Sequence, residues 1–273
     1  MRRQPISEQP FLSIVIPAYN EERRLPPNLK RVLEYLDTQP FEAEVIVVDD
    51  GSEDRTVQRV REVAADDPRV RIIENEHYGK AYAVRTGMLA ARGEIVLFSD
   101  ADLSTPIHEI ERFFPYFEQN YDIVIGSREG GGPNQRVGEP FYRHLMGRVF
   151  NLLVQLLAVP GIRDTQCGFK AMRREAVHDL FPRLRIHDGS KGPVKGSMVT
   201  GFDVELLFLA LQLGYKVKEV PVEWRYGRES KVNPLIDSWR LFRDVLMVRW
   251  NHLLGRYDMR PKAAASNHPP TAH

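Results

Sequence analysis

The sequence predicts an α/β protein in which a mainly parallel β-sheet carries helices on both faces. Its first half alternates short apolar runs, rich in β-branched residues, with stretches whose apolar residues recur at helical spacing. Several apolar runs end in clusters of polar residues, and such sheets bind ligands at the carboxyl ends of their strands. The same alternation therefore predicts both the fold class and the edge of the sheet where function is expected.

In the first half, strands and helices alternate strictly. Three of the expected strands, at 11–16, at 44–48 and after Gly93, are runs too apolar to face water, and a proline or an acidic turn closes each of them. Ser52 or Asp54 is placed to cap the second helix. The expected strands are residues 11–16, 44–48, 70–73, the run from Gly93 to the acidic segment at Asp100, and 122–125; the expected helices are 20–36, a segment from the cap to about 65, 78–91 and 107–119.

The second half is less regular, and we expect one domain at residues 11–232, preceded by an extension at 1–10 and followed by two further segments. The first segment, 233–257, is an amphipathic helix with apolar residues at helical spacing among arginines. The second, 258–273, has low hydrophobicity and is expected to be disordered. The other expected elements are loops at 129–140 and 185–196, helices at 143–159 and 202–213, a strand at 217–222 and a basic loop at 225–231.

Composition argues against several classes of protein. With 42% hydrophobic and 27% charged residues, the chain has the balance of a soluble globular protein. The net charge of +1 argues neither for nor against a nucleic-acid partner, and we expect none. Cys167 is the only cysteine, so no internal disulfide can form, which fits a reducing compartment. No apolar run reaches the roughly 18 residues of a membrane span, and the basic N-terminus lacks the apolar core of a signal peptide. These features predict a cytoplasmic protein.

Two carboxylates, Asp100 and Asp102, follow the fourth expected strand. If the chain is still extended there, both side chains point to one face. Two hard oxygen ligands side by side suit Mg²⁺ or Mn²⁺, and such an ion can also hold a diphosphate. Taken alone, the pair fits an ordinary acidic turn better. Glu21 and Asp50 follow the first two strands, however, so several acids that packing does not require come to one sheet edge.

Several motifs together resemble the family 2 glycosyltransferases of GT-A fold. The first are Ile14–Glu22, Val47–Ser52 and Asp100–Asp102. Further motifs resemble the polyprenyl-phosphate branch of the family, of the dolichyl-phosphate glucosyltransferase type: Gly79–Lys80 with Arg85–Met88, Gly126–Arg128, Asp164–Lys170, Gly201–Glu205 and Arg228–Lys231. The resemblance covers residues 11 to about 232. Members of this branch often carry a transmembrane helix at one end, and this sequence departs from them in having no such run.

The resemblance implies a nucleotide-sugar site at the strand ends. Asp50 would accept a hydrogen bond from the imino N–H of the base, which favours uracil, and Lys80 would close over the diphosphate. Asp102, with Asp100 beside it, would hold Mg²⁺ or Mn²⁺, whose charge offsets that of the departing diphosphate. On the residues alone, Asp50 could be a turn residue and Lys80 a solvated helix start. The residues that the family's motifs assign to this site are Pro17, Tyr19, Glu21, Asp50, Gly79, Lys80, Asp100, Ala101 and Asp102.

The acceptor that the resemblance implies is a polyprenyl phosphate. A phosphate monoester has a second pKa of about 6, so at neutral pH it needs cations to position it and no strong base. Guanidinium groups suit this role, although each single arginine could be an ordinary surface residue. A sugar hydroxyl acceptor would instead demand a carboxylate base, such as Asp164, Asp203 or Glu205. The expected phosphate-binding residues are Arg128, Arg143, Arg228 and Lys231, and the expected catalytic residues are Asp102, Arg128, Arg143, Asp164 and Arg228.

We therefore expect an inverting, metal-dependent enzyme that transfers a hexose, glucose from UDP-glucose, to a polyprenyl or dolichyl phosphate at the cytoplasmic face of a membrane. The alternatives are a GDP-mannose-dependent polyprenyl-phosphate mannosyltransferase and a family 2 transferase with a soluble sugar acceptor. A nucleotidyltransferase would have a glycine-rich, arginine-bearing loop after the first strand, which this sequence lacks. The intact acidic pair argues against a protein that only binds nucleotide. The amphipathic helices at 143–159 and 233–257 favour peripheral contact with a membrane surface over core packing.

Overall fold

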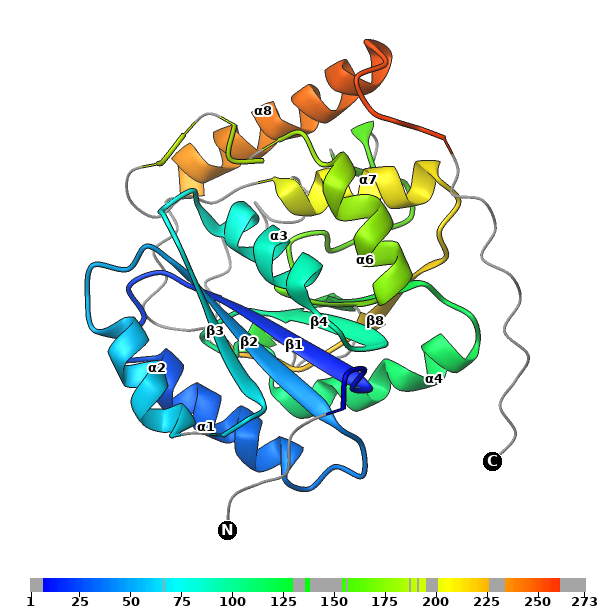
Figure 1. The fold of residues 1–273 in the computed structure, drawn as a ribbon. Helices are drawn as coiled ribbons and strands as arrows, with labels where there is room; N and C mark the ends of the chain where they lie inside the picture. Colours follow the sequence, from blue (N-terminus) through cyan, green and yellow to red (C-terminus); the bar gives the residue numbers. More distant parts are fainter. Residues whose placement is uncertain are drawn as a thin grey trace.

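The computed structural model describes residues 7–65, 67–129, 136–137, 154–155, 157–186, 188–190, 192–194, 201–225 and 234–260, with 136–137 and 234–238 in backbone only. A seven-stranded sheet forms its centre, and helices cover both faces (Figure 1). Most of the expected helix at 143–159, most of the basic loop at 225–231 and the tail from 261 lie outside the described residues.

The seven strands follow the order β3-β2-β1-β4-β7-β5-β8. β1 to β4 are parallel to one another, and β5 is parallel to β8, whereas β7 runs antiparallel between β4 and β5. The mainly parallel sheet that the alternating pattern predicts is therefore confirmed. The strands are β1 (Leu12–Ala18), β2 (Ala43–Asp50), β3 (Val70–Asn75), β4 (Ile95–Ser99), β5 (Ile123–Ser127), β7 (Phe169–Arg173) and β8 (Val217–Pro221), and β6 (Arg136–Val137) pairs separately with β9 (Trp224–Arg225).

The antiparallel strand β7 was not predicted. Its first two residues are the last two of the motif 164–170, which was noticed in the sequence. The chain continues from β7 into α6 (Arg174–Leu180) and η2 (Phe181–Arg183). Lys170 interrupts the apolar pattern of β7, yet it is fully buried in the centre of the sheet. A buried charge of this kind hides a central strand from any reading based on apolar runs.

The first helix begins later than the sequence suggests, at Leu25 instead of Asn20. Asn20 has a φ of 54°, outside the helical region, and Pro26 and Pro27 fit only a first turn, where a missing N–H costs no bond. Pro115 acts similarly within the expected helix 107–119, which divides into a 3₁₀ segment and a short α-helix. The helices are α1 (Leu25–Leu36), α2 (Thr56–Ala64), α3 (Lys80–Ala90), η1 (Ile107–Arg112), α4 (Phe114–Glu118), α7 (Phe202–Gln212) and α8 (Pro234–Leu253).

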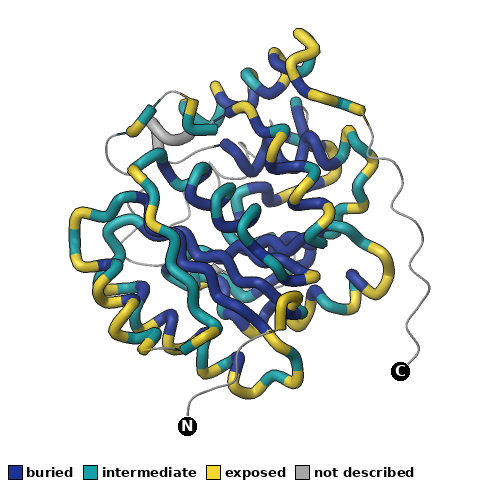
Figure 2. The backbone as a smooth tube through the Cα atoms, in the orientation of Figure 1, coloured by how far each residue is buried: buried dark blue, intermediate teal, exposed yellow. Residues whose placement is uncertain are grey.

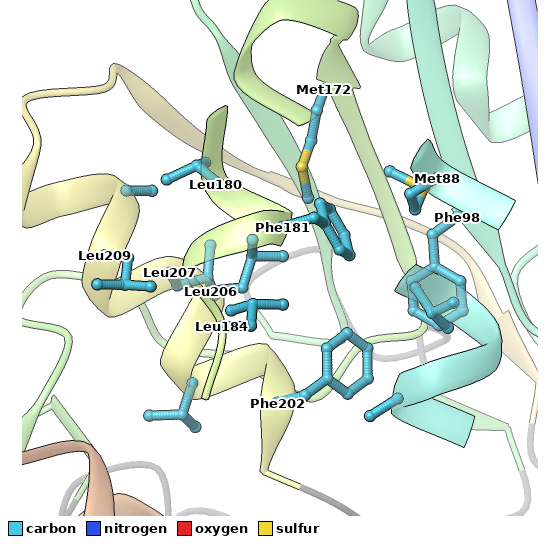
Figure 3. Packing of buried hydrophobic residues seen from close by; sticks show 14 of the residues in the cluster. Met88, Phe98, Met172, Leu180, Phe181, Leu184, Phe202, Leu206, Leu207 and Leu209 are labelled. Carbon is cyan, nitrogen blue, oxygen red and sulfur yellow. The ribbon is translucent and has the colours of Figure 1, made fainter. Parts of the chain in front are cut away.

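Alternating strand residues build two apolar layers, one on each face of the sheet. Val15 faces the layer under α3, α6, α7 and α8, whereas its neighbours Ile14 and Ile16 face α1, α2 and α4. Figure 3 shows the first layer, where Phe98 of β4 meets Phe202 of α7 with ring centroids 6.1 Å apart. This packing places the end of β4 directly under the start of α7.

The last helix, α8, lies over α7 at the outside of the molecule (Figure 1). Val245 and Val248 are buried against the rest of the chain, while other residues of α8 face outward (Figure 2). None of the helices in the described ranges combines the length and the apolar character that a membrane crossing needs.

Candidate active site

The carboxyl ends of β1, β2 and β4 lie side by side, because these strands are parallel neighbours. Tyr19 and Glu21 follow β1, Asp50 ends β2, and Asp100 and Asp102 follow β4. Across the sheet edge, α3 begins at Lys80 directly after Gly79. The predicted nucleotide-sugar residues are thus brought to one edge, with Pro17 inside β1 and Ala101 buried between the two aspartates.

Hydrogen bonds tie the loops after β1 and β2 together. The Asn20 side-chain oxygen accepts from the N–H of Glu53 at 2.9 Å, and the Asn20 N–H donates to the Ser52 hydroxyl at 2.9 Å. Asp54 accepts from the N–H of Thr56, the first residue of α2. The predicted cap by Ser52 or Asp54 is wrong, because Arg55 occupies the N-cap position of α2 and makes no side-chain cap hydrogen bond. Asp54 bonds to Thr56 from one position before the cap, and the Ser52 hydroxyl accepts from the neighbouring loop.

Asp50 organises the loop that leads into α3. Its carboxylate, almost fully buried, accepts from His77 Nδ1 at 2.8 Å and from the N–H groups of Tyr78 and Gly79 at 2.9 Å each. Burial raises the pKa of Asp50 and outweighs these donors. The His77 ring also stacks on Tyr19, with centroids 3.9 Å apart and planes 3° apart. Both carboxylate oxygens already have partners within the chain, so Asp50 positions this loop.

The acidic segment after β4 is a turn and not extended chain. β4 ends at Ser99, and Leu103 has a φ of 46°. The sequence places Asp100 and Asp102 on one face only on the condition that the chain is extended there. That condition is not met, so strand alternation does not align the two side chains. Asp102 accepts from the N–H of Ser104 at 3.0 Å, and the side-chain amide of Asn28 in α1 donates to the Ala101 carbonyl at 2.9 Å. These bonds hold the turn that presents both carboxylates.

Lys80 is paired with this turn. Its ammonium lies 2.6 Å from Asp100 Oδ1 and 5.3 Å from the centre of the Phe98 ring. Burial alone would lower the pKa of Lys80, but the carboxylates of Asp100 and Asp203 outweigh it and raise that pKa. Lys80 therefore stays cationic at the edge where a diphosphate is expected.

Gly168, the residue before β7, is packed against Asp100. The N–H of Asp100 donates to the Gly168 carbonyl at 3.1 Å, and a Cβ added to Gly168 would lie 1.9 Å from Asp100 Oδ2. Asp100 can occupy this position only if residue 168 has no side chain. The backbone of Gly168 is not in the left-handed region, so space alone demands the glycine.

We predict that Gly168→Ala displaces Asp100 and lowers the affinity for UDP in the presence of Mn²⁺ by about tenfold or more, with about 1–3 kcal/mol lost from the free energy of unfolding. Binding calorimetry and urea unfolding measure the two effects. Gly161→Ala is the control, because Gly161 has a φ of 85° but nothing within 4 Å of an added Cβ. It should cost stability and leave UDP affinity unchanged. Equal UDP affinities in the two variants would contradict the prediction.

A buried ion pair lies beneath the acidic turn. Lys170 of β7 is fully buried, with its ammonium 2.6 Å from Asp203 Oδ1 and also bonded to the Cys167 carbonyl. Burial raises the pKa of Asp203 in spite of Lys170 and Lys80 nearby. Asp203, one of the carboxylates considered as a base, is thus the counterion of Lys170 at the start of α7.

Arg128 and Asp164 form a second charged pair. Arg128 donates to Asp164 from its Nε, its Nη2 and its backbone N–H, each at 2.8 Å. Asp164 is fully buried, and burial alone would raise its pKa, but the Arg128 guanidinium outweighs burial and lowers the pKa to about 2. The same guanidinium lies 5.5 Å from the centre of the Trp224 ring. Asp164 is therefore an ionised partner that orients Arg128.

We predict that Asp164→Asn removes about 2 kcal/mol from the free energy of unfolding at neutral pH, because the Asp164 pKa lies well below its ordinary value of about 3.9 in an unfolded chain. A lowered pKa stabilises the folded protein above about pH 4, and that stability is lost as the pH falls towards 2. In urea unfolding from pH 7 to 2, the difference in stability between the two proteins should therefore shrink below about pH 4 and be smallest at the acid end. A constant difference at every pH would contradict the assignment.

Glu205, the third carboxylate considered as a base, is held by the chain itself. It is fully buried in α7 and accepts from the N–H groups of Arg185 and Ile186 and, at 2.7 Å, from the Tyr257 hydroxyl. Burial and this carboxylate raise the pKa of Tyr257. Glu205 joins residues before α7 to Tyr257, which follows α8, and none of the three carboxylates is placed as an unengaged base.

The residues of the acidic turn fit a divalent cation. Asp100 and Asp102 supply carboxylate oxygens, the ligands that Mg²⁺ and Mn²⁺ prefer, and Asp100 already attracts one cation, the Lys80 ammonium. Elsewhere in the described ranges, His108, Glu109 and Glu223 form the one group of at least three such side chains close enough to share an ion. Arg112 and Arg225 pair with its two carboxylates, which accounts for that group without a metal.

Sequence reasoning missed the parts of the site that depend on long-range contacts. Gly168 and Lys170 lie in a motif that was noticed, but their functions depend on contacts with Asp100 and Asp203. His77 gave no signal beyond its place two residues before Gly79. Three predicted phosphate-binding residues, Arg143, Arg228 and Lys231, lie outside the described residues, so the structure places only Arg128 of that set.

Comparison with known proteins places this geometry in a family. The sequence profile of "Glycosyl transferase family 2" matches residues 13–181. Proteins named "Dolichyl-phosphate beta-glucosyltransferase" are similar over most of the chain. The Drosophila melanogaster protein is 37% identical over 262 residues, 90% of this chain and 76% of its own. The Dictyostelium discoideum protein is 34% identical over 263 residues, 92% and 77% of the two chains.

Solved structures share the fold at low sequence identity. Glucosyl-3-phosphoglycerate synthase from Mycobacterium tuberculosis, in complex with Mn²⁺, UDP-glucose and phosphoglyceric acid, superposes with a TM-score of 0.62 at 21% identity, over 88% of this chain and 79% of that one. A mannosyltransferase from Pyrobaculum calidifontis, in complex with GDP-mannose and Mn²⁺, has a TM-score of 0.58 at 20% identity, over 90% of this chain and 65% of its own. The fold predicted from the sequence is the one that these proteins adopt.

Proposed function

The chain belongs to glycosyl transferase family 2, and from this membership we propose that it transfers glucose from UDP-glucose to the phosphate of a dolichyl or other polyprenyl lipid. The observation that carries the proposal is similarity to dolichyl-phosphate β-glucosyltransferases along nine-tenths of the chain. A direct, in-line attack by the acceptor inverts the anomeric centre, so an α-linked donor gives a β-linked product.

The state of the carboxylates supports a phosphate acceptor. Asp164 is bound to the partly exposed Arg128 guanidinium, Asp203 is bound to the buried Lys170 ammonium, and Glu205 accepts hydrogen bonds from the chain itself. A sugar hydroxyl would need one of them as a base, whereas a phosphate monoester is already anionic at neutral pH. Arg128, oriented by Asp164, is then the described cation suited to position the acceptor phosphate, with Arg143, Arg228 and Lys231 proposed beside it.

On the donor side, we propose that Asp100 and Asp102 hold Mg²⁺ or Mn²⁺. The structural neighbours include complexes with Mn²⁺ and with Mg²⁺. When bound, the ion offsets the charge of the departing diphosphate. Lys80 adds positive charge at the same edge, and the Asp50 loop with the Tyr19–His77 stack forms the wall proposed to receive the nucleoside.

A polyprenyl phosphate is a membrane lipid, so the acceptor side must work at a bilayer. We propose peripheral association with the cytoplasmic face of a membrane. In this proposal residues 11–232 form the transferase domain, and the exposed side of α8, which follows that domain in the sequence, forms a separate surface.

A donor panel tests the proposal. UDP with Mg²⁺ or Mn²⁺ should raise the melting temperature, since a ligand at about a hundredfold excess over its Kd adds about 2.7 kcal/mol of stability. GDP should give no shift. UDP-glucose with a short-chain polyprenyl phosphate should then yield the glucosylated lipid, while the matching polyprenol, which lacks the phosphate, should not react. A shift with GDP alone would overturn the donor assignment, and glucosylation of the polyprenol would overturn the acceptor assignment.

A further inference from the structure

The outer face of α8 is unusual in this molecule. Within the described residues, the large hydrophobic side chains that are exposed all lie on α8 or directly after it: Trp239 (68% exposed), Leu246 (45%), Trp250 (60%), Leu253 (71%) and Leu254 (48%). Trp239, Leu246, Trp250 and Leu253 are spaced by seven, four and three residues, so they form one stripe along the helix, here called the outer stripe.

The outer stripe is exposed while the opposite face of the same helix is firmly packed. Val245 and Val248 are buried, and the His252 ring lies edge-on to Phe208 of α7 with centroids 5.1 Å apart. Asp244, also buried, accepts from the N–H of Gly201 at 3.0 Å. The contacts of the inner face fix the rotation of α8, so Trp239 and Trp250 of the stripe stay exposed.

The charges around the outer stripe are positive. Arg243 lies within the arc of the stripe with its side chain 56% exposed, although one of its guanidinium nitrogens reaches Asp244 at 3.4 Å. Arg249 is exposed beside Trp250, with its guanidinium 6.0 Å from the centre of the Phe208 ring. Among the α8 side chains that are described, Asp244 is the one carboxylate, and it is buried on the inner face. An exposed helix face that combines indole, leucine and arginine, with its acid hidden, suits an anionic lipid surface. A second copy would set arginines against arginines, which disfavours self-association.

We infer that the outer stripe docks the protein on an anionic bilayer, with the tryptophans at the interface and the arginines on lipid phosphates. The identity of the acceptor rests on the proposed function, but the docking surface rests on α8 alone. Its inner face links it to the site. Asp244 holds Gly201, which precedes Phe202 and Asp203 at the start of α7, and Asp203 pairs with Lys170 beneath the acidic turn. The docked helix is thus hydrogen-bonded to the segment that carries a carboxylate of the active site.

Vesicle flotation tests this inference. The full chain should float with phosphatidylcholine vesicles that contain phosphatidylglycerol, float less with pure phosphatidylcholine, and be released by salt as screening of the arginines requires. Trp239→Ser and Trp250→Ser should each weaken binding about tenfold. Arg249→Glu should weaken binding to the anionic vesicles. Arg59→Glu, the same charge change in α2 on the opposite face of the sheet, is the control and should float like the unaltered protein.

The outcomes separate docking from catalysis, because UDP binding is measured on every variant. Loss of flotation with unchanged UDP affinity supports the outer stripe as the docking surface. Flotation that survives the double tryptophan variant overturns the inference, as does a concentration-dependent dimer, seen by sedimentation, that the tryptophan variants abolish. If the protein floats but transfers nothing to a polyprenyl phosphate, the proposed function fails and the docking surface stands.

Discussion

Asp102→Asn should lower kcat/KM for glucosyl transfer by roughly 10²- to 10³-fold, the usual effect of removing one preorganised charge at a reacting phosphate. The substitution removes a negative charge but keeps an oxygen that can accept from the N–H of Ser104, so the turn after β4 should keep its shape. The loss is therefore attributable to cation binding. Steady-state kinetics across a range of Mg²⁺ and Mn²⁺ concentrations measure it.

A second measurement on the same variant separates metal binding from catalysis. UDP affinity should rise with metal concentration in the unaltered protein and depend on it much less in Asp102→Asn. Glu53→Gln is the matched control, because it removes one exposed carboxylate from the neighbouring loop without touching the turn. Unchanged transfer and an unchanged metal dependence in Asp102→Asn would rule out Asp102 as a ligand, and the acidic pair would then be an ordinary turn.

The second large effect is expected at the buried ion pair. Lys170→Met should cost about 3–5 kcal/mol in the free energy of unfolding, because it leaves the Asp203 carboxylate buried without its closest cation. Adding Asp203→Asn should recover much of that loss, since a neutral amide beside a thioether avoids an isolated charge. Urea unfolding of the two single variants and the double variant gives the coupling energy.

An exposed pair provides the comparison. Lys30 and Glu34 lie 3.8 Å apart on α1 with side chains 72% and 61% exposed, and Lys30→Met should change stability by less than about 0.5 kcal/mol. If Lys170→Met were as mild, Lys170 would not be the counterion of Asp203. If the double variant were no more stable than Lys170→Met, the loss would come from packing and not from charge.

The strand ends show how far a sequence can predict an active site. Asp50, Asp100 and Asp102 could be assigned to one sheet edge because strict alternation of strands and helices makes neighbouring strands parallel. The family resemblance then supplied the ligand, and the comparisons confirm the family. Both steps use local patterns. Such patterns can be recognised in a sequence because each strand and each motif is a continuous stretch of the chain.

Other features are decided by contacts between distant residues. Lys170 and Asp203 are 33 positions apart in the sequence, and nothing in the sequence around either residue predicts that they form an ion pair. Gly168 looks like any glycine before a strand until Asp100 is seen to occupy the space of its missing side chain. The same holds for Asp50. Its carboxylate was expected to accept a hydrogen bond from the nucleotide base, but in the structure it accepts from His77 and Gly79 of the neighbouring loop.

For α8, the sequence determined that the helix is amphipathic and aromatic, but periodicity alone could not say whether its apolar residues pack inward or face outward. The tertiary structure decided this, because Asp244, Val245 and Val248 pack against α7 and its start and so turn Trp239 and Trp250 away from the core. The physical reason is general. Hydrophobic periodicity records which residues share a face, whereas only the packing of the whole chain determines which face is covered.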